Sequence, residues 1–390
     1  MNANVEELRT RLERYNSFLA QDPGNTSLSN EVADVHLRLG HFEEARTVLR
    51  SALTSHPTHP ALLSTMASVA MAAGNPAEAI KILQGLIQAG QDHPVNRFNL
   101  SYALLYARQF DEARAILQSV VDDPRIPEAP VLYARLLHHL GELGEAIERL
   151  GVFVTQHPNH AEALGVLSLL HLDAMNTEGA RAAAEITMAA NPDDLPALVT
   201  LGSLALETQD EKTSSDYFMR AIEHHPQSGR AWSGLGLATM LKLDIKTAIE
   251  QLQQAVTFMP NHIGTWHALA WCQLLANDIE GAKQSFEKSM DIDRSFGETH
   301  GGLAVIAVMQ NRQVDAEQAI KRALRLNPSS YAGQFAQSLL LQKSNPEQAK
   351  QIIQKMFARP LAGKNEPFEQ TLKQALQRMP HLRSYKPPAK

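Results

Sequence analysis

A proline recurs along this chain every 34 residues, and this period constrains the fold more than any other feature of the sequence. Most neighbouring members lie one period apart, and two periods separate the last two. An independent series of alanines has the same spacing, with Ser214 in its one gap. Such a period predicts stacked copies of one small unit, because a single unit cannot bury its own apolar face. The prolines are Pro23, Pro57, Pro124, Pro158, Pro192, Pro226, Pro260 and Pro328, and the alanines are Ala45, Ala79, Ala113, Ala146, Ala180, Ala248, Ala282 and Ala316.

A second small residue stands twelve positions before each member of the alanine series, and a large apolar residue precedes it. This pattern predicts two helices per unit, which meet where small side chains let their axes approach and a large neighbour fills the groove. The sequences LGHF, AGNP and ANDI mark turns between the two helices. The small residues are Ala33, Ala67, Ser101, Ala134, Ser168, Gly202, Gly236, Ala270 and Ala304, and the large ones are Val32, Met66, Leu100, Tyr133, Leu167, Leu201, Leu235, Leu269 and Leu303.

The unit at residues 229–260 carries the pattern most fully, and it resembles the tetratricopeptide repeat. The residues that match the family's signature positions are Trp232, Leu235, Gly236, Ala248, Leu252, Ala255 and Pro260. The resemblance implies an all-α solenoid or superhelix of antiparallel helix pairs, with about nine full repeats. We expect an N-terminal capping helix in residues 1–25, nine repeats in 26–330, a degenerate tenth in 331–358, and a C-terminal helix with a basic tail in 359–390.

Local departures from the pattern affect single units. One residue is missing between Ala113 and Ala146, around the sequence DDPRIPEAP, so the third and fourth units are expected to join at an altered angle. Arg294 takes the place of a proline in the series. Near the C-terminus an amphipathic helix is expected to cover the last repeat, because apolar residues recur there at helical spacing. They are Phe368, Leu372, Ala375, Leu376 and Met379.

Composition narrows the class of protein. The 390 residues are 44% hydrophobic and 20% charged, which is typical of a soluble folded chain. The net charge of -6 argues against general nucleic-acid binding. We expect no membrane span, because no apolar run approaches the required length, and no secretory signal, because the first residues are charged. Cys272 is the only cysteine, which fits a reducing compartment, and we expect a cytoplasmic protein.

Two tryptophans five residues apart, Trp266 and Trp271, occupy different positions in the repeat, one in the core and one in the groove. Trp266 aligns with Trp232 at a signature core position, so the frame assigns it to structure. Trp271 follows the small Ala270, at a position that in the resembled family usually faces the concave groove. We therefore expect truncation of Trp271 to leave stability nearly unchanged, whereas removing a buried tryptophan costs about 3 to 5 kcal/mol.

Equivalent groove positions in the other repeats give a set of candidate partner-binding residues. Aromatic side chains, methionine and arginine are enriched where proteins bind one another, and such a groove suits a peptide or a partner helix. The plainer interpretation is that the innermost positions, Met240 among them, pack against neighbouring repeats. The candidates are Phe98, Tyr102, Tyr106, Arg135, His138, Leu237, Met240, His267, Trp271 and Val305.

The sequence offers no catalytic residue, metal site or cofactor site. The Gly-x-Gly of SGLGLATM lies within a repeat helix, and the paired histidines of HPTH and HPNH occur in turns that do not converge. Glycines inside first helices, at positions 165, 234, 301 and 302, either make room for a ligand backbone or reflect neutral drift. The basic clamp that chaperone-binding relatives use for carboxylate tails has no counterpart, and Asn99 alone stands at the position of an asparagine ladder.

These observations favour a non-enzymatic scaffold or adaptor that holds a peptide or helix of another protein in its concave groove. Two alternatives remain open. One is a client-specific chaperone or a targeting factor for a secretion or assembly component. The other is an accessory subunit that positions substrate for an enzyme on another chain. Self-association through an unfinished end of the solenoid is a further possibility, and it predicts a mass that depends on concentration.

Overall fold

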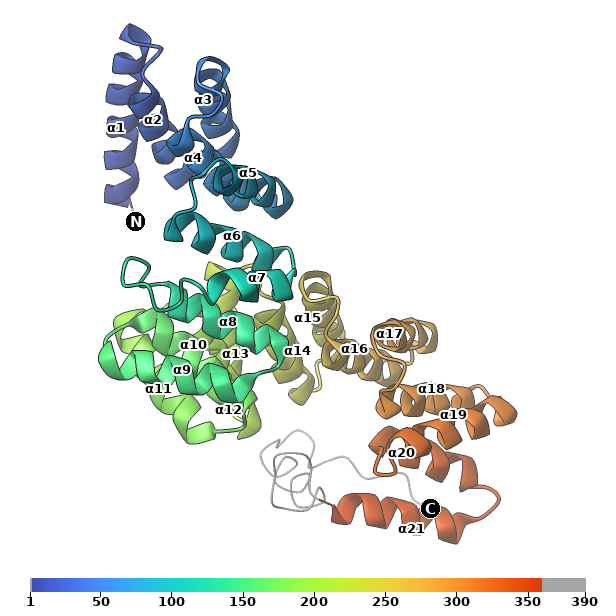
Figure 1. The fold of residues 1–390 in the computed structure, drawn as a ribbon. Helices are drawn as coiled ribbons and strands as arrows, with labels where there is room; N and C mark the ends of the chain where they lie inside the picture. Colours follow the sequence, from blue (N-terminus) through green and yellow to red (C-terminus); the bar gives the residue numbers. More distant parts are fainter. Residues whose placement is uncertain (1, 360–390) are drawn as a thin grey trace. The chain divides into compact units, whose positions relative to one another are not determined.

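The computed structural model describes residues 2–359, in which twenty-one helices and no strand occur (Figure 1). Helix α1 (Asn2–Gln21) comes first, and within each unit the later helices contact one another in consecutive pairs. The expected all-α repeat solenoid is confirmed. The expected C-terminal helix, at residues 368–379, lies outside the described residues.

The chain divides into two compact units, Met1–Leu170 and His171–Lys390, and the sequence pattern did not indicate this division. The boundary falls within α10. Helices of unit 1 are α2 (Thr26–Arg38), α3 (Phe42–Ser55), α4 (Pro60–Ala72), α5 (Pro76–Gln88), α6 (Pro94–Tyr106), α7 (Phe110–Leu117), α8 (Ala129–Leu140), α9 (Leu143–Gln156) and the first part of α10 (Ala161–Asp173).

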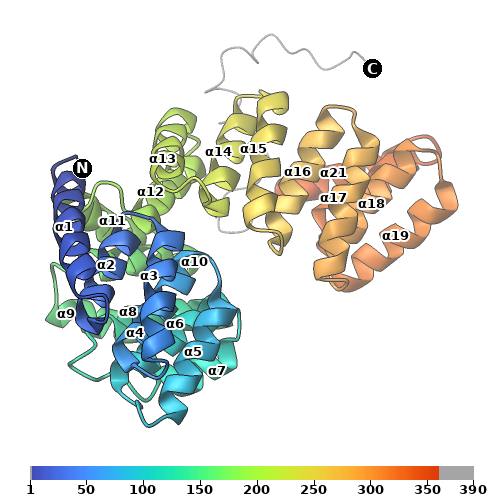
Figure 2. The ribbon, with the colours of Figure 1, turned by 90° about the horizontal axis from the view of Figure 1, so that it is seen from above.

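Unit 2 continues the same pairing to the last described helix (Figure 2). Its helices are α11 (Thr177–Ala190), α12 (Leu195–Glu207), α13 (Glu211–His224), α14 (Gly229–Leu241), α15 (Ile245–Phe258), α16 (Ile263–Leu275), α17 (Ile279–Ile292), α18 (Gly297–Met309), α19 (Gln313–Leu326), α20 (Tyr331–Leu341) and α21 (Pro346–Ala358).

The small residues of the two periodic series are buried. Every member of the alanine series is fully buried, and Ser214, which fills its gap, is buried as well. The Ser214 hydroxyl donates a hydrogen bond to the carbonyl oxygen of Gly202 at 2.9 Å. This bond satisfies a polar group that would otherwise be costly to bury, which explains why a serine fits there. Of the large residues, only Leu303 is half-buried; the others are buried.

A left-handed residue ends the first helix of each of the nine pairs from α2/α3 to α18/α19. It is a glycine at Gly40, Gly74 and Gly141, where positive φ carries no steric cost. Six pairs use a residue with a side chain at the same place, including the exposed Met175 with φ 58°. Such a backbone costs roughly 1 to 2 kcal/mol for an ordinary residue, so these turns carry local strain. The other five residues are Arg108, Gln209, Leu243, Asn277 and Asn311.

The glycines within first helices of unit 2 are explained by packing rather than by drift or by a ligand. A β-carbon on Gly234 would lie 2.1 Å from Cζ of Phe218, and one on Gly302 would lie 2.4 Å from Cζ of Phe286. Both phenylalanines are fully buried. At Gly301 the close neighbour is the backbone of α20, with the amide nitrogen of Gly333 at 2.4 Å. These glycines therefore form notches into which the neighbouring element fits.

The third pair departs from the others, where a residue is missing from the repeat. Helix α7 is short and ends at Leu117, and residues 118–128 form turns before α8 begins. Asp123 accepts hydrogen bonds from the backbone nitrogen of Arg125 at 3.0 Å and from its guanidinium at 2.7 and 2.9 Å. These bonds hold the pKa of the Asp123 carboxyl down at about 2. The irregular segment is thus ordered by local polar contacts.

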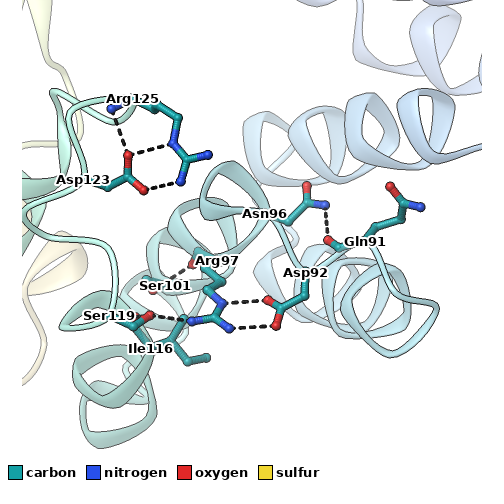
Figure 3. A network of polar contacts seen from close by, with 9 residues as sticks. All are labelled: Gln91, Asp92, Asn96, Arg97, Ser101, Ile116, Ser119, Asp123 and Arg125. Carbon is teal, nitrogen blue, oxygen red and sulfur yellow. Dashed lines mark hydrogen bonds and ion pairs between the residues drawn. The ribbon is translucent and has the colours of Figure 1, made fainter.

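Arg97 fixes the start of α6 beside the end of α7 (Figure 3). Its guanidinium binds both carboxylate oxygens of Asp92, at 2.6 and 2.7 Å, and donates to the hydroxyl of Ser119 at 3.0 Å. Two parallel bonds to one carboxylate define the orientation of an arginine better than a single contact does. The network therefore positions α6, which carries the aromatic candidates of unit 1.

Candidate functional site

An open apolar groove of about 530 Å³ lies on the first helices of unit 1. Helices α2, α4 and α6 are the first helices of three consecutive pairs, and α4 contacts α2. All but two of the lining side chains, those of Ser68 and Asn99, are apolar or aromatic. The groove of unit 1 is defined by Leu37, Ala67, Ser68, Met71, Ala72, Leu83, Phe98, Asn99, Tyr102 and Tyr106.

The helical register of α6 produces the aromatic side of this groove. Phe98, Tyr102 and Tyr106 are four residues apart and share one helix face, whereas Leu100 and Leu104 point into the core and are buried. Phe98 and Tyr102 are half-buried, while Tyr106 is 57% exposed. The structure therefore brings the three aromatic candidates of unit 1 together in one groove.

The two tyrosines contact each other through both ring and hydroxyl. Their ring centroids lie 4.8 Å apart, and the Tyr102 hydroxyl donates to the Tyr106 hydroxyl at 3.2 Å. Burial, followed by this hydrogen bond, raises the pKa of Tyr102. The Tyr102 phenol is therefore uncharged near neutral pH. The pair presents an apolar surface with a polar tip, a combination frequent at protein interfaces.

Two further candidates of unit 1 lie on α8. Arg135 forms an ion pair with Glu162 of α10, with Nη2 and Oε1 2.9 Å apart, and both side chains keep substantial exposure. Arg135 and Glu162 also act electrostatically on Tyr102 in opposite directions. His138 is half-buried and stacks with His139, with ring centroids 6.1 Å apart. Arg135 is thus already engaged within the chain, although its pair is accessible.

The groove also contains residues that sequence reasoning missed. Ser68 and Ala72 lie one period before Tyr102 and Tyr106, and their small side chains leave the space that the larger rings border. Met71 and Leu37 form the apolar wall and are themselves one period apart. Comparing the size of side chains at equivalent positions of successive repeats provides the signal that finds these residues.

In unit 2, Trp271 borders a separate cavity of about 450 Å³, the Trp271 pocket. The indole is half-buried and meets the ring of Phe286 edge to face, with centroids 5.8 Å apart. Trp271 also packs against two core clusters. Its truncation is therefore expected to reduce stability, in contrast to the expectation from the sequence. The other lining residues are Tyr331, Ala332, Phe335, Ile353, Met356 and Phe357.

Of the other groove candidates of unit 2, one is buried and three are half-buried. Val305 is only 2% exposed, so its assignment as a contact residue is wrong. His267 is half-buried, and its Nε2 forms a hydrogen bond with the Thr299 hydroxyl at 2.9 Å. Burial lowers the pKa of His267 to about 4. Met240 is half-buried against the core of α15 and α16, as the plainer interpretation states, and Leu237 is half-buried as well.

Metal-binding clusters and the cysteine are two places where reactive chemistry could reside in residues 2–359. This part of the chain contains no group of three or more His, Cys, Asp or Glu residues that could hold a metal ion. Cys272 is buried, and burial raises the pKa of its thiol to about 11, which keeps it in the unreactive protonated form. No helix of the described residues is long and apolar enough to cross a membrane.

Stacked helix pairs with an open groove on their first helices define a helical-repeat protein. Tetratricopeptide repeat family models match residues 44–97 and 70–125, residues 12–60, and residues 263–296. The matched segments are tetratricopeptide repeats, which supports a tetratricopeptide repeat protein. Repeats of this family are generally non-catalytic modules that bind proteins, so the chain is an interaction scaffold.

Several solved structures match part of the chain. One, described as a functional characterization of pilF of Pseudomonas aeruginosa, is 16% identical, with a TM-score of 0.46 over 55% of this chain and 97% of that one. A crystal structure of MamA is 18% identical, with a TM-score of 0.37 over 40% of this chain and 92% of that one. The MamA RS-1 ArsTM double mutant is 21% identical, with a TM-score of 0.34 over 43% of this chain and 95% of that one. No curated protein matches the sequence.

Proposed function

We propose that this protein is a non-enzymatic adaptor that binds an apolar peptide or helix of a partner protein in the groove of unit 1. The observation that carries the proposal is the exposed aromatic edge of that groove. Tyr106 keeps 57% of its surface exposed beside a half-buried tyrosine, at the mouth of an apolar cavity. Large apolar side chains that a soluble chain leaves accessible in one concave place commonly mark a binding site.

The lining of the groove indicates what a ligand must present. Met71 and Leu37 offer apolar surface, and Met71 adapts its shape to different side chains. The Asn99 amide and the hydroxyls of Ser68 and the two tyrosines are the polar groups that can orient a peptide backbone or a side-chain hydroxyl. A partner helix with two large apolar residues four positions apart fits these requirements, since both lie on one helix face.

The ion pair of Arg135 and Glu162 offers charge near the groove without favouring one sign. Its members lie 2.9 Å apart and remain partly exposed, so charged flanks of a ligand can compete for either member. Exposed ion pairs of this kind contribute only about 0 to 1 kcal/mol to stability. Replacing one member of the pair by a charged group of the ligand therefore costs little free energy. We expect charge to tune the affinity and apolar contacts to supply most of it.

A blocking substitution tests the groove without removing any core contact. Ser68 is exposed and lines the groove, so Ser68→Arg fills it with a long charged side chain. Tyr106→Ala removes the exposed anchor. The matched control is Gln84→Arg, an exposed position of the second helix α5 that does not line the groove. Melting temperatures of all three variants should match that of the wild type.

The readout is quantitative capture of partners from the native lysate, followed by calorimetric titration of a synthetic peptide from the captured protein. We expect the wild type and Gln84→Arg to capture the same protein. Ser68→Arg and Tyr106→Ala should weaken peptide binding at least tenfold. Equal capture and equal peptide affinity for all four proteins would show that the groove of unit 1 is not the recognition site.

The identity of the captured protein separates the adaptor from its alternatives. A single aggregation-prone client, kept soluble by this chain, would favour the chaperone or targeting role. An enzyme whose activity toward its substrate rises on binding would favour the accessory-subunit role. A cytoplasmic setting is part of the proposal, and it is supported by the presence of a single cysteine.

A further inference from the structure

The charge of the chain is distributed unevenly, and unit 2 carries an excess of cations on α19 and α21. The whole chain has a net charge of -6, whereas residues 318–359 contain seven Lys or Arg residues and one acid, Glu347. No ion pair joins any of the seven to a carboxylate of the described residues. These helices therefore present positive charge that the chain itself does not balance. The seven cations are Lys321, Arg322, Arg325, Lys343, Lys350, Lys355 and Arg359.

Two of these cations line a cavity of about 590 Å³ between α19, α20 and α21, the α21 cavity. Gln334 and Gln337 are three residues apart on α20, so both reach it from one helix face. No carboxylate occurs among its described lining residues. The cavity thus combines cationic and amide donors with apolar surface. The lining residues that define it here are Leu324, Gln334, Gln337, Ile352, Lys355 and Arg359.

Arg359 is held in place by contacts with the start of α20. Its Nη2 donates to Oε1 of Gln334 at 2.6 Å, and its Nη1 donates to the carbonyl oxygen of Ser329 at 3.3 Å. The guanidinium carbon lies 4.8 Å from the centre of the Tyr331 ring. The Nε of Arg359 is buried and has no hydrogen-bond partner in the part of the chain that the structure describes. A buried donor without an acceptor costs free energy, so this arginine is fixed but not fully satisfied.

We propose that the α21 cavity binds an acidic segment of a partner protein. A carboxylate of that segment pairs with Lys355 and Arg359, since ammonium and guanidinium groups are the usual partners of carboxylates. An apolar side chain beside the carboxylate packs on Leu324 and Ile352. The Gln337 amide donates a further hydrogen bond to the ligand. The unpaired cations outside the cavity attract the acidic segment and speed its association.

The shape and lining of the cavity favour a peptide over other anionic partners. A lipid surface or a nucleic-acid backbone is bound by cations that project over a wide area and meet many phosphates. Here the two lining cations share a hollow with apolar and amide groups, which suits a single acidic residue with an apolar neighbour. The site consists of residues of unit 2 alone, so the inference does not depend on the function proposed for the groove of unit 1.

Fluorescence anisotropy of a labelled peptide with the full chain tests the proposal. The probe is a short peptide with one leucine among glutamates, and its neutral twin has glutamine in place of each glutamate. We expect the wild type to bind the acidic probe about tenfold more tightly than the twin. Lys355→Glu and the nearly isosteric Gln337→Glu each bring negative charge to the cavity wall. Both should weaken binding of the acidic probe by about tenfold.

Matched controls make the same charge changes outside the cavity. Lys350→Glu and Gln354→Glu lie at exposed positions of α21 that do not line it, and each should keep the affinity within about threefold. Tyr106→Ala, in the groove of unit 1, should leave the affinity unchanged, which separates the two sites. Melting temperatures equal to that of the wild type show that each variant is folded.

The proposal is overturned if the wild type binds both peptides equally or binds neither. It is also overturned if Lys350→Glu weakens binding as much as Lys355→Glu does, because the effect would then come from net charge. Binding to phosphatidylserine vesicles in place of the peptide, lost in Lys355→Glu, would assign the cavity to a lipid surface. A mass that rises with concentration in light scattering, and does so only with Lys355 intact, would assign it to a second copy of the chain. Either result would contradict the proposal.

Discussion

The indole N–H of Trp266 donates a hydrogen bond to the carbonyl oxygen of Pro260, six residues earlier, at 2.7 Å. Trp232 makes the same bond to Pro226 at 2.8 Å, one period before. In the two following units His300 and Gln334 occupy this place, and their side-chain nitrogens donate at 2.9 Å to the carbonyl six residues before them. Four units with different residues at this position thus stabilise the turn before the first helix with the same side-chain-to-carbonyl hydrogen bond.

This bond predicts a modest, specific effect of replacing Trp266 by phenylalanine. Trp266→Phe keeps an aromatic ring in a half-buried place, but it removes the N–H donor and also part of the indole that packs on the core. The freed carbonyl belongs to the exposed Pro260 and can bind water, so the free energy of unfolding should fall by about 0.5 to 1.5 kcal/mol. Urea unfolding measures this change. A variant as stable as the wild type would show that the bond contributes nothing.

The notch at Gly234 predicts that Gly234→Ala destabilises the protein, although alanine has a higher helix propensity than glycine. A β-carbon there would overlap the fully buried ring of Phe218, and overpacking of this kind typically costs about 1 to 3 kcal/mol. Phe218→Leu should restore part of the loss in the double variant, because the two residues share one space. Thermal and urea unfolding of the single and double variants measure the coupling.

A matched glycine provides the control for that experiment. Gly151 lies within helix α9, and a β-carbon there would meet nothing within 4 Å. Gly151→Ala should therefore raise stability by roughly 0.5 to 1 kcal/mol through helix propensity alone. If Gly234→Ala behaved in the same way, the notch interpretation would be wrong.

The strained turn at Met175 predicts a stabilising substitution. Met175 has φ 58° and is 76% exposed, so Met175→Gly relieves the backbone and removes few contacts. We expect a gain of up to about 1 kcal/mol, since the greater freedom of unfolded glycine offsets part of the relief. Gly74→Ala is the reverse test at an open position with φ 75°, and it should lower the melting temperature.

His267 predicts a loss of stability in mild acid. Its pKa is lowered by burial to about 4 in the folded chain, against an ordinary value of 6.5. Between these values the unfolded chain binds a proton that the folded chain does not, so the free energy of unfolding falls as pH decreases from 6.5 toward 4. From pH 7 to pH 5 this single group accounts for about 2 kcal/mol.

His267→Asn isolates that contribution. The variant loses the hydrogen bond to Thr299 at every pH, so the quantity to compare is the change in unfolding free energy between pH 7 and pH 5. This change should be smaller in the variant than in the wild type by about 2 kcal/mol. Burial also lowers the pKa values of His36, His171 and His262, and their effect remains in both proteins. Parallel pH profiles would contradict the assignment.

The repeat was determined by the sequence alone, because its signals are local and recur. Each small residue of the alanine series lies where two helices must approach, and each is fully buried in the structure. Phe98, Tyr102 and Tyr106 could be placed on one helix face because four residues make about one turn. The period also predicted the fold class, because a repeated pair of helices has few ways to bury its apolar faces.

Side-chain contacts between helices were decided only by the tertiary structure. Trp271 and Val305 occupy groove positions in the repeat frame, yet the first packs on Phe286 and the second is 2% exposed. The frame states which face of a helix a residue shares, but burial depends on the size of the residues that neighbouring helices bring to it. Gly234 shows the same limit, because only the position of the Phe218 ring explains why a residue without a β-carbon is required there.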